Sequence, residues 1–162
     1  MPYATQRAPA VDELDVRLLT LLADEPRIGI LESSRRLGVA RGTAQARLDK
    51  LVGRDVIASF APQVEPAALG FGVTAFTTLE IRQGRGDEVV DHLREIPEVL
   101  EVHKTTGAGD LLCRIVARDN SDLQRVIDDV VGDANIERAS TVISLARPVP
   151  YRVLPLVAIA AG

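Results

Sequence analysis

The stretch that most constrains the fold of this chain is residues 27–57, which read RIGILESSRRLGVARGTAQARLDKLVGRDVI. Its apolar spacing predicts a short helix over about 30–37, burying Leu31 and Leu37, and a longer helix that begins after a turn at Gly38. Glycine suits that turn because it adopts a left-handed backbone at little cost. The inward face of the longer helix is predicted to carry Ala44, Leu48, Leu51 and Val52. Two helices across a tight turn are typical of a helix-turn-helix.

The outer face of the longer helix carries small and polar side chains that suit contact with double-stranded DNA. Gly42 and Ala46 would let the helix approach the floor of a groove, where Thr43 can reach a base edge. Arg47 and Lys50 are expected to contact phosphates. The predicted DNA-contacting residues, which include the polar flank of this helix and the exposed face of the shorter one, are Arg35, Arg36, Arg41, Gly42, Thr43, Gln45, Ala46, Arg47 and Lys50.

Charge is distributed unevenly along the chain, which has 162 residues and a formal net charge of −4. Residues 26–54 hold seven Lys and Arg against two acidic residues, whereas residues 61–162 have a balance of −5. A positive segment in an acidic chain indicates a surface that meets DNA phosphates. An ordinary helical hairpin with solvated arginines is the alternative, and the charge asymmetry favours the DNA-binding interpretation.

Composition narrows the class of protein further. Aromatic residues make up 3% of the chain, so the core is aliphatic and stacking on single-stranded bases is disfavoured. The single cysteine, Cys113, excludes an intrachain disulfide and a cysteine-cluster zinc site, and it is expected to be buried and inert. No spacing of His, Asp and Glu suggests a metal, and no cofactor is predicted. Without a secretory leader or a span-length apolar run, the chain is expected to be cytoplasmic, with no membrane contact.

From residue 72 onward the pattern changes from helical to mixed. Strands are predicted at 73–81, 99–105, 111–118 and 136–147, with helices at 87–96 and 121–132. The order β-α-β-β-α-β predicts a ferredoxin-like domain, in which two helices cover one face of a four-stranded antiparallel sheet. The other face is left open, and a homodimer paired sheet against sheet is the simplest way to cover it.

These patterns predict an α+β chain with an N-terminal winged helix-turn-helix domain and a C-terminal ferredoxin-like βαββαβ domain. Asp12 is expected to cap the first helix, which should end near Asp24, and a short strand or wing is expected over 58–64. The predicted order is a flexible tail over 1–11, the DNA-binding domain over 12–60, a linker over 61–71, the ferredoxin-like domain over 72–150, and a tail over 151–162 that packs at the interface between copies.

Short motifs are spread over about residues 12–157. They are Leu14-Asp15 with Leu18-Leu19, Pro26-Arg27, Leu37-Gly38-Val39, Arg47-Leu48 with Leu51, Val56-Ile57, Glu65-Pro66 with Leu69-Gly70, Pro97-Glu98-Val99, and Gly107 to Leu112. In this order and spacing they resemble the Lrp/AsnC, or feast/famine, family of transcriptional regulators.

The resemblance implies a sequence-specific regulator that binds DNA as a homodimer or a larger even assembly, often an octamer. It also implies an effector, an amino acid or a related metabolite, that lies between ligand-binding domains and shifts assembly and DNA binding. The effector pocket implied by position comprises Thr106, Gly107, Ala108, Gly109, Asp110, Ser140 and Thr141. His103 lies close to this turn and is open to three roles: structural, effector contact or catalytic. The two glycines of the turn either allow close approach of a ligand or subunit, or form a plain tight turn.

Two other functions stay open at this point. Sirohaem decarboxylases are similar in domain order and would make the chain an enzyme, but the basic helix is retained and no catalytic residue is predicted. The second alternative is an effector-binding module whose head no longer binds DNA. It is kept because Ala40 stands where the family usually has a capping serine, and because Ser33 and Ser34 replace the usual Leu-Ala.

Overall fold

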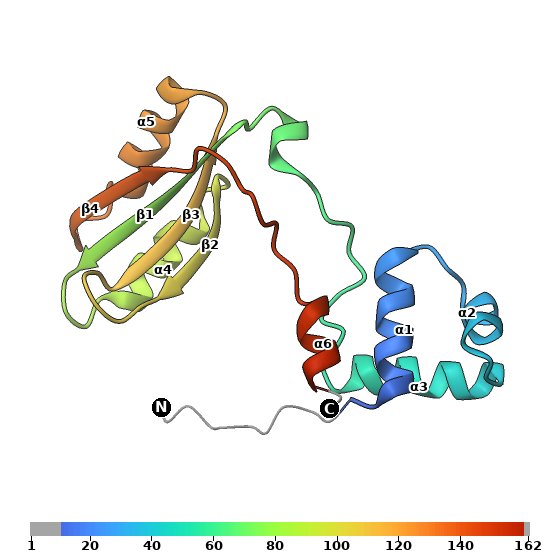
Figure 1. The fold of residues 1–162 in the computed structure, drawn as a ribbon. Helices are drawn as coiled ribbons and strands as arrows, with labels where there is room; N and C mark the ends of the chain where they lie inside the picture. The colour runs from blue at the N-terminus through green and yellow to red at the C-terminus, as the bar shows by residue number, and fades with distance from the viewer. Residues whose placement is uncertain (1–10, 161–162) are drawn as a thin grey trace. The chain divides into compact units, whose positions relative to one another are not determined.

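The computed structural model describes residues 11–160, which form two compact units. The first unit ends at Pro62 and resumes at Val149, and the second comprises Gln63–Pro148. Along the chain, the α+β domain is thus inserted between two segments of the helical head (Figure 1). The predicted tail over 1–11 lies outside the described residues except for Val11, which is buried in the core of the head.

Three helices form the helix-turn-helix head: α1 (Glu13–Asp24), α2 (Ile30–Leu37) and α3 (Arg41–Gly53). Asp12 caps α1 as predicted, because its side chain accepts the backbone N–H of Asp15 while Asp15 accepts that of Asp12. Gly38 ends α2 with a φ of 70°, the left-handed turn expected of it. The helices pack around a small aliphatic core of Val11, Leu18, Leu37 and Leu51.

Two details of the predicted head are wrong. Leu31 and Val52, predicted to face inward, have 49% and 40% of their surface exposed. In α2 the buried stripe is Ser33, Ser34 and Leu37, which turns Leu31 toward solvent. Residues 58–64, predicted as a short strand or wing, form no strand, because no strand in the described part of the chain pairs with them.

A further helix, α6 (Leu154–Ala160), packs against α1 within the first unit. Leu154 and Val157 are half-buried, whereas Leu156 and Ile159 are 60% and 75% exposed. The described part of the tail therefore contributes to the head of its own chain. Packing of the tail across an interface between copies stays a prediction.

The second unit contains the predicted sheet. Its elements are β1 (Val73–Ile81), α4 (Gly86–Arg94), β2 (Val99–Lys104), β3 (Leu111–Ala117), α5 (Asn120–Val130) and β4 (Ile136–Ile143). The strand order is β2-β3-β1-β4, all pairs are antiparallel, and α4 and α5 cover one face (Figure 1). This is the ferredoxin-like arrangement that the sequence predicts. β4 ends at Ile143, which pairs with Ala75 of β1, rather than at residue 147.

Alternation along each strand separates a core face from an open face. Residues on the helix-facing side form the core with α4 and α5: Ala75, Leu79, Val89, Leu93, Ile96, Leu111, Cys113, Ile115, Ala117, Leu123, Val126 and Val130. On the open face Phe76 of β1 pairs with Val142 of β4, and their side chains are 36% and 62% exposed. Apolar side chains on the open face are what the prediction of a sheet-to-sheet dimer requires.

The predicted linker contains a short 3-10 helix, Pro66–Leu69, that ends in a left-handed turn at Gly70. Glu65 at its start forms an ion pair with Arg147 after β4, with 2.9 Å between Oε2 and Nη2. The ring of Phe71 at its end lies under the guanidinium of Arg118, 5.1 Å from the ring centroid. The linker from Glu65 onward is thereby fixed to the second unit.

Candidate nucleic-acid interface and effector site

α3 presents one face to solvent. Ala44 and Leu51 are buried on its inner side, where they meet the other helices of the head. The exposed positions are Arg41, Gly42, Thr43, Gln45, Ala46, Asp49, Lys50, Val52 and Gly53. Gln45 donates its amide N–H to the Asp49 carboxylate one turn later, at 2.8 Å. The sequence therefore identified the exposed face of α3 correctly.

Gly42 has no role in packing within the head. A Cβ placed at Gly42 would meet no other heavy atom within 4 Å. Glycine inside a helix nevertheless costs about 1 kcal/mol of helix stability relative to alanine. No contact among residues 11–160 requires a glycine here, so a glycine at this position suits close approach to an external partner.

Two basic residues of α3 lie against α1 instead of projecting freely. The guanidinium of Arg47 pairs with the carboxylates of Asp12 and Asp15, and its Nη1 lies 3.2 Å from Asp15 Oδ1. The ammonium of Lys50 lies 3.8 Å from Asp15 Oδ2. Hydrogen bonds to Asp12 and Asp15 raise the pKa of Arg47, and the backbone N–H of Asp15 together with Arg47 lowers the pKa of Asp12. Contact of Arg47 and Lys50 with phosphates thus stays a prediction, and the structure adds that both residues already have anionic partners.

The arginines of α2 are also paired. Arg36 hydrogen-bonds to Glu32, at 3.2 Å, and to Glu25, and these bonds raise its pKa. Arg35 lies 3.6 Å from Glu32. Both arginines stay exposed, as predicted. Their positive charges are balanced by the carboxylates of Glu32 in α2 and Glu25 before it.

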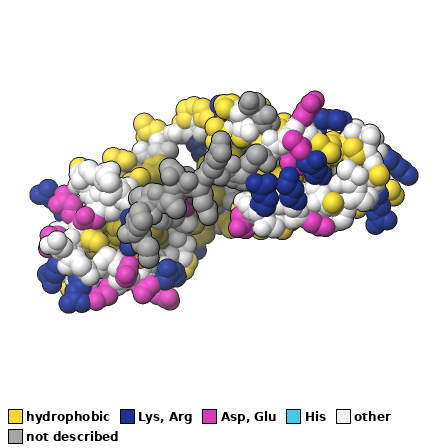
Figure 2. All heavy atoms as spheres, turned by 90° about the horizontal axis from the view of Figure 1, so that it is seen from below, with side chains coloured by type: hydrophobic (Ala, Val, Ile, Leu, Met, Phe, Trp, Pro, Cys, Tyr) yellow, Lys and Arg dark blue, Asp and Glu magenta, His cyan; other side chains and the backbone are white. Residues whose placement is uncertain are grey.

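The apparent charge excess over 26–54 is therefore largely compensated in the folded head. Its acidic partners Asp12, Asp15 and Glu25 lie outside that window in the sequence. Within residues 11–160, Arg27 and Arg41 have neither an ion pair nor a side-chain hydrogen bond. On the visible face of the molecule, basic side chains lie interspersed with acidic ones (Figure 2). Arg41, at the start of α3, is thus the cation of the DNA-facing set that has no carboxylate partner within residues 11–160.

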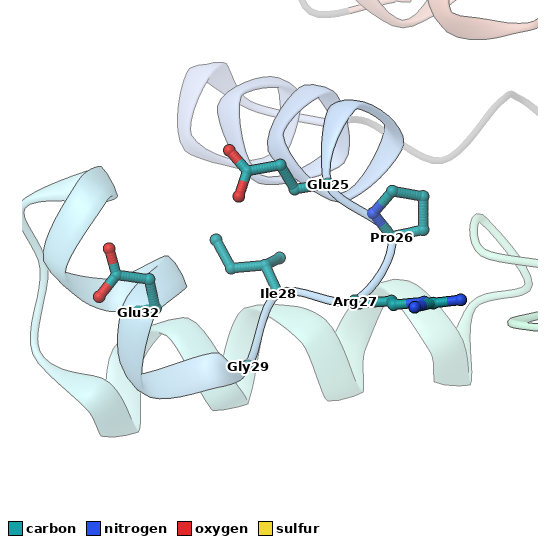
Figure 3. A pocket seen from close by; sticks show the side chains of 6 residues that line it. All are labelled: Glu25, Pro26, Arg27, Ile28, Gly29 and Glu32. Carbon is teal, nitrogen blue, oxygen red and sulfur yellow. The ribbon is translucent and has the colours of Figure 1, made fainter.

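A shallow depression lies at the turn between α1 and α2. Its lining is Glu25, Pro26, Arg27, Ile28, Gly29 and Glu32. Ile28 lies between the two glutamates, and the side chain of Arg27 points away from them (Figure 3). Because both glutamates bind Arg36, the lining offers an incoming ligand no free charged group apart from Arg27.

The serines that replace the family's usual Leu-Ala are accommodated by local hydrogen bonds. Ser33 and Ser34 are 1% and 4% exposed. Their hydroxyls donate to the backbone carbonyls of Gly29 and Leu31, at 3.0 and 2.8 Å. No buried polar atom is therefore left without a partner at these two positions, and the helix-turn-helix is intact.

The turn between β2 and β3 is fixed to the end of β1. The backbone N–H of Asp110 donates to the carbonyl of Leu79 at 2.8 Å, and the Asp110 carboxylate accepts the N–H of Ile81 at 2.8 Å. Thr105 closes the turn by donating its hydroxyl to the carbonyl of Gly109 at 2.9 Å. Asp110, predicted as an effector contact, thus has a structural hydrogen bond within the chain.

The two glycines of this turn have different reasons to be glycine. Gly107 has a φ of 111°, a left-handed conformation that other residues rarely adopt. Gly109 packs so closely on β1 that a Cβ would lie 2.3 Å from Thr78 Cγ2 and 3.2 Å from the carbonyl oxygen of Leu79. Both requirements arise inside this chain, so the plain-turn interpretation accounts for these glycines. The tip of the turn, Thr106 to Ala108, is exposed.

Strand register places the other predicted effector residues on opposite faces. His103, Leu112, Thr78 and Ser140 form one row across β2, β3, β1 and β4 on the open face. Thr141 points to the core side, where its hydroxyl lies 2.9 Å from that of the fully buried Thr77. The structure thus brings His103 and Ser140 to the same face and separates Thr141 from them.

The remaining candidates for chemistry have structural surroundings. Burial raises the pKa of the Cys113 thiol to about 11, which favours the unreactive protonated form. His92 of α4 is half-buried, and its Nε2 lies 2.9 Å from the Asp129 carbonyl oxygen at the end of α5. Within residues 11–160, no three His, Cys, Asp or Glu side chains converge as a metal site would need. No helix in that range is long and apolar enough to cross a bilayer.

The two units together define a helix-turn-helix DNA-binding protein with a separate α+β ligand-type domain. Residues 11–52 match the AsnC-type helix-turn-helix domain, and residues 74–154 match the Lrp/AsnC ligand binding domain. This chain belongs to the Lrp/AsnC family of transcriptional regulators.

Individual relatives and solved structures are similar to this chain over most of their length. The HTH-type transcriptional regulator FL11 of Pyrococcus horikoshii is 30% identical, over 83% of this chain and 89% of its own. The HTH-type transcriptional regulator AldR of Mycolicibacterium smegmatis is 29% identical, over 83% and 81%. The structure of Escherichia coli AsnC superposes with a TM-score of 0.83 at 25% identity, covering 90% of this chain and 99% of that one. A Neisseria meningitidis regulator solved with L-methionine has a TM-score of 0.82 at 23% identity, covering 92% and 99%.

Proposed function

We propose that this regulator binds double-stranded DNA through the exposed face of α3, as a homodimer, and that an amino acid bound by the second domain modulates this binding. The observation that carries the proposal is the composition of that face. Gly42 and Ala46 offer no steric obstacle, Thr43 and Gln45 offer hydrogen-bonding groups, and Arg41 carries a charge that has no ion-pair partner among residues 11–160. Small residues beside polar ones suit an approach to base edges in a major groove.

The exposed arginines of α2 are assigned to the edge of the DNA contact. Arg35 and Arg36 are held by Glu32 and Glu25, so their contribution to phosphate binding is expected to be smaller than that of Arg41. Arg41 begins α3, where the helix dipole also favours a phosphate.

The proposed dimer covers the open face of the sheet. Phe76 and Val142 supply its exposed apolar centre. The cross-strand ion pairs Glu101–Arg114 and Glu80–Arg138, each at 3.6 Å, flank this centre. An apolar centre with charged margins is typical of a protein–protein interface, and an isologous pairing would match each patch with its own copy. Larger even assemblies would be built from such dimers.

The proposed effector is an amino acid. Two related structures support this chemistry, since a Neisseria meningitidis regulator and a feast or famine regulatory protein of Mycobacterium tuberculosis were both solved with L-methionine. In this chain the accessible candidates are His103, Ser140 and the exposed turn Thr106 to Ala108. Gly109, Asp110 and Thr141 are proposed to shape the site rather than to contact the ligand, because their groups are engaged within the chain. The relatives are named regulators, which favours regulation over a sirohaem decarboxylase activity.

The test is binding of the purified protein to a labelled fragment of its own upstream DNA, across a salt series and with non-specific competitor. We expect competitor-resistant binding and an affinity that falls steeply with salt. Thr43→Ala and Gln45→Ala should each weaken specific binding by about tenfold, since one good base contact is worth about 1–3 kcal/mol. Arg94→Ala, an exposed arginine of α4, is the matched control and should leave the affinity unchanged. Binding no tighter than to competitor would refute the proposal.

Gly42→Ala gives a second, independent test of the DNA-facing surface. The added methyl meets nothing inside the head, so the variant should be more stable than the wild type, by about 1 kcal/mol. The same methyl would obstruct a groove floor, so DNA affinity should fall although stability rises. A variant that gained stability and kept its affinity would exclude close approach of α3 to DNA at Gly42.

A further inference from the structure

We propose that Asp15 is a positioning residue for DNA recognition: it holds the cationic groups of Arg47 and Lys50 of α3 against α1, so that neither cation neutralises a DNA phosphate. The inference rests on the proposed DNA-binding role of α3 and deepens it. It assigns a charge-setting function to an acidic residue of α1, a helix that does not itself provide the DNA-facing surface.

The carboxylate of Asp15 accepts two hydrogen bonds and also forms an ion pair with Lys50. Its side chain is 1% exposed, although it is an aspartate near the start of a helix. Oδ1 accepts the guanidinium N–H of Arg47 at 3.2 Å. Oδ2 accepts the backbone N–H of Asp12 at 3.2 Å and lies 3.8 Å from the ammonium of Lys50. Asp15 therefore joins the cap of α1 to two successive basic positions of α3.

Burial of the Asp15 carboxylate makes it costly for Arg47 and Lys50 to leave it for a DNA phosphate. A buried carboxylate is strongly disfavoured unless cations or hydrogen-bond donors surround it. If Arg47 or Lys50 moved to a phosphate, Asp15 would lose part of that compensation while staying inside the head. Arg47 also pairs with Asp12, and only 30% of its side chain is exposed. By contrast, Arg41 is exposed and forms no ion pair in the described part of the chain, so it can bind a phosphate without giving one up.

The same contacts define which face of α3 is turned outward. Arg47 and Lys50 are three residues apart, so they are neighbours on the helix surface and both reach one carboxylate. The two contacts, from Arg47 and Lys50 to the buried carboxylate of Asp15, oppose rotation of α3 about its axis. Gly42, Thr43 and Ala46 are thereby kept on the exposed side. Asp15 thus acts on recognition through the two basic residues of α3.

The decisive measurement is the salt dependence of DNA binding by Asp15→Asn. This change keeps the shape of the side chain and removes its charge. Each neutralised phosphate contributes about −0.9 to the slope of log affinity against log salt concentration. If Asp15 withholds both cations, the slope of the variant should become more negative by about 0.9 to 1.8 per head. Affinity for competitor DNA should rise at low salt, and the ratio of specific to non-specific affinity should fall.

Asp91→Asn is the matched control for net charge. Asp91 is an exposed residue of α4 that pairs with Arg94, so its substitution changes the charge equally but leaves the head untouched. Its slope should equal that of the wild type. Asp12→Asn is a milder variant, because Asp12 is half-exposed and asparagine caps helices well. It should steepen the slope less than Asp15→Asn does.

Lys50→Gln tests the inference without disturbing a buried group, since 42% of the Lys50 side chain is exposed. If Asp15 withholds Lys50, this variant should keep the wild-type slope. A slope flattened by about 0.9 would show Lys50 on a phosphate and overturn the inference. Equal slopes for folded Asp15→Asn and wild type would overturn it as well. Failure of the wild-type protein to bind its DNA would instead refute the proposed function itself.

Discussion

The hydroxyl oxygens of Thr141 on β4 and Thr77 on β1 lie 2.9 Å apart on the helix-facing side of the sheet. Thr77 is fully buried, so Thr141 is the partner that compensates its hydroxyl. Ser140, the preceding residue, points to the opposite face, in one row with His103. Two adjacent residues of one strand therefore serve different faces of the sheet: Thr141 the buried core and Ser140 the open face.

Thr141→Val should destabilise the second domain without affecting an effector on the open face. It leaves the buried Thr77 hydroxyl without a partner, which costs about 1–3 kcal/mol in the free energy of unfolding. Urea unfolding measures this loss, and the double variant Thr77→Val with Thr141→Val should recover most of it. Ser140→Ala should keep stability and weaken amino-acid binding, measured by calorimetry. If Thr141→Val instead weakened amino-acid binding and kept stability, Thr141 would belong to the ligand site.

Gly109→Ala should destabilise the turn between β2 and β3. Its new methyl would overlap Thr78 Cγ2, and overpacking of this kind costs about 1–3 kcal/mol. Thr78→Ser removes that Cγ2, so the double variant should be less damaged than additivity predicts, as a double-mutant cycle would reveal. Gly72→Ala, where a Cβ would meet no atom within 4 Å, is the control and should have little effect. If the two losses of stability simply added, the overlap with Thr78 Cγ2 would not be the cause of the damage.

Ala40→Ser should stabilise the start of α3. Ala40 already has the extended backbone of a cap residue, with φ −63° and ψ 147°, but it has no side chain to accept a helix N–H. A serine hydroxyl would accept the N–H of Thr43 and contribute about 1 kcal/mol. Hydrogen exchange in the first turn of α3 should therefore slow by about fivefold. Ala58→Ser, an exposed position outside any helix, should show no such protection. Unchanged exchange would mean that another group already satisfies this turn.

Cys113 should report unfolding of the second domain. Its thiol is fully buried, and its pKa of about 11 lies above the ordinary value of 9.0. Because the folded state retains the proton longer than the unfolded chain, stability from this group is complete below about pH 8.5 and is lost as the pH rises toward 11. Labelling with a thiol reagent at pH 8 should be slow in the native protein and fast in urea. In Cys113→Ala, this part of the alkaline loss of stability should disappear; fast native labelling would contradict the assignment.

Local patterns in the sequence were sufficient for most elements of the two domains, but not for the wing predicted over 58–64, the helix α6 or the exposure of Leu31 and Val52. The bounds of α2 and β1, the cap at Asp12 and the left-handed turn at Gly38 follow from interactions between residues at most a few positions apart. The same holds for the exposed face of α3, because helical periodicity alone determines which positions share a side. The motif order along the chain was enough to identify the family.

Pairings between distant residues were decided only by the tertiary structure. Arg47 meets Asp12 and Asp15 across more than thirty residues of chain, so a count of charges over 26–54 overstates what is free to bind DNA. Close approach of Gly109 to β1 likewise depends on the docking of a turn, which no local period encodes. Sequence periodicity specifies which way a side chain points from its own element. Only the packing of elements against one another specifies which charge, hydroxyl or backbone group it meets there.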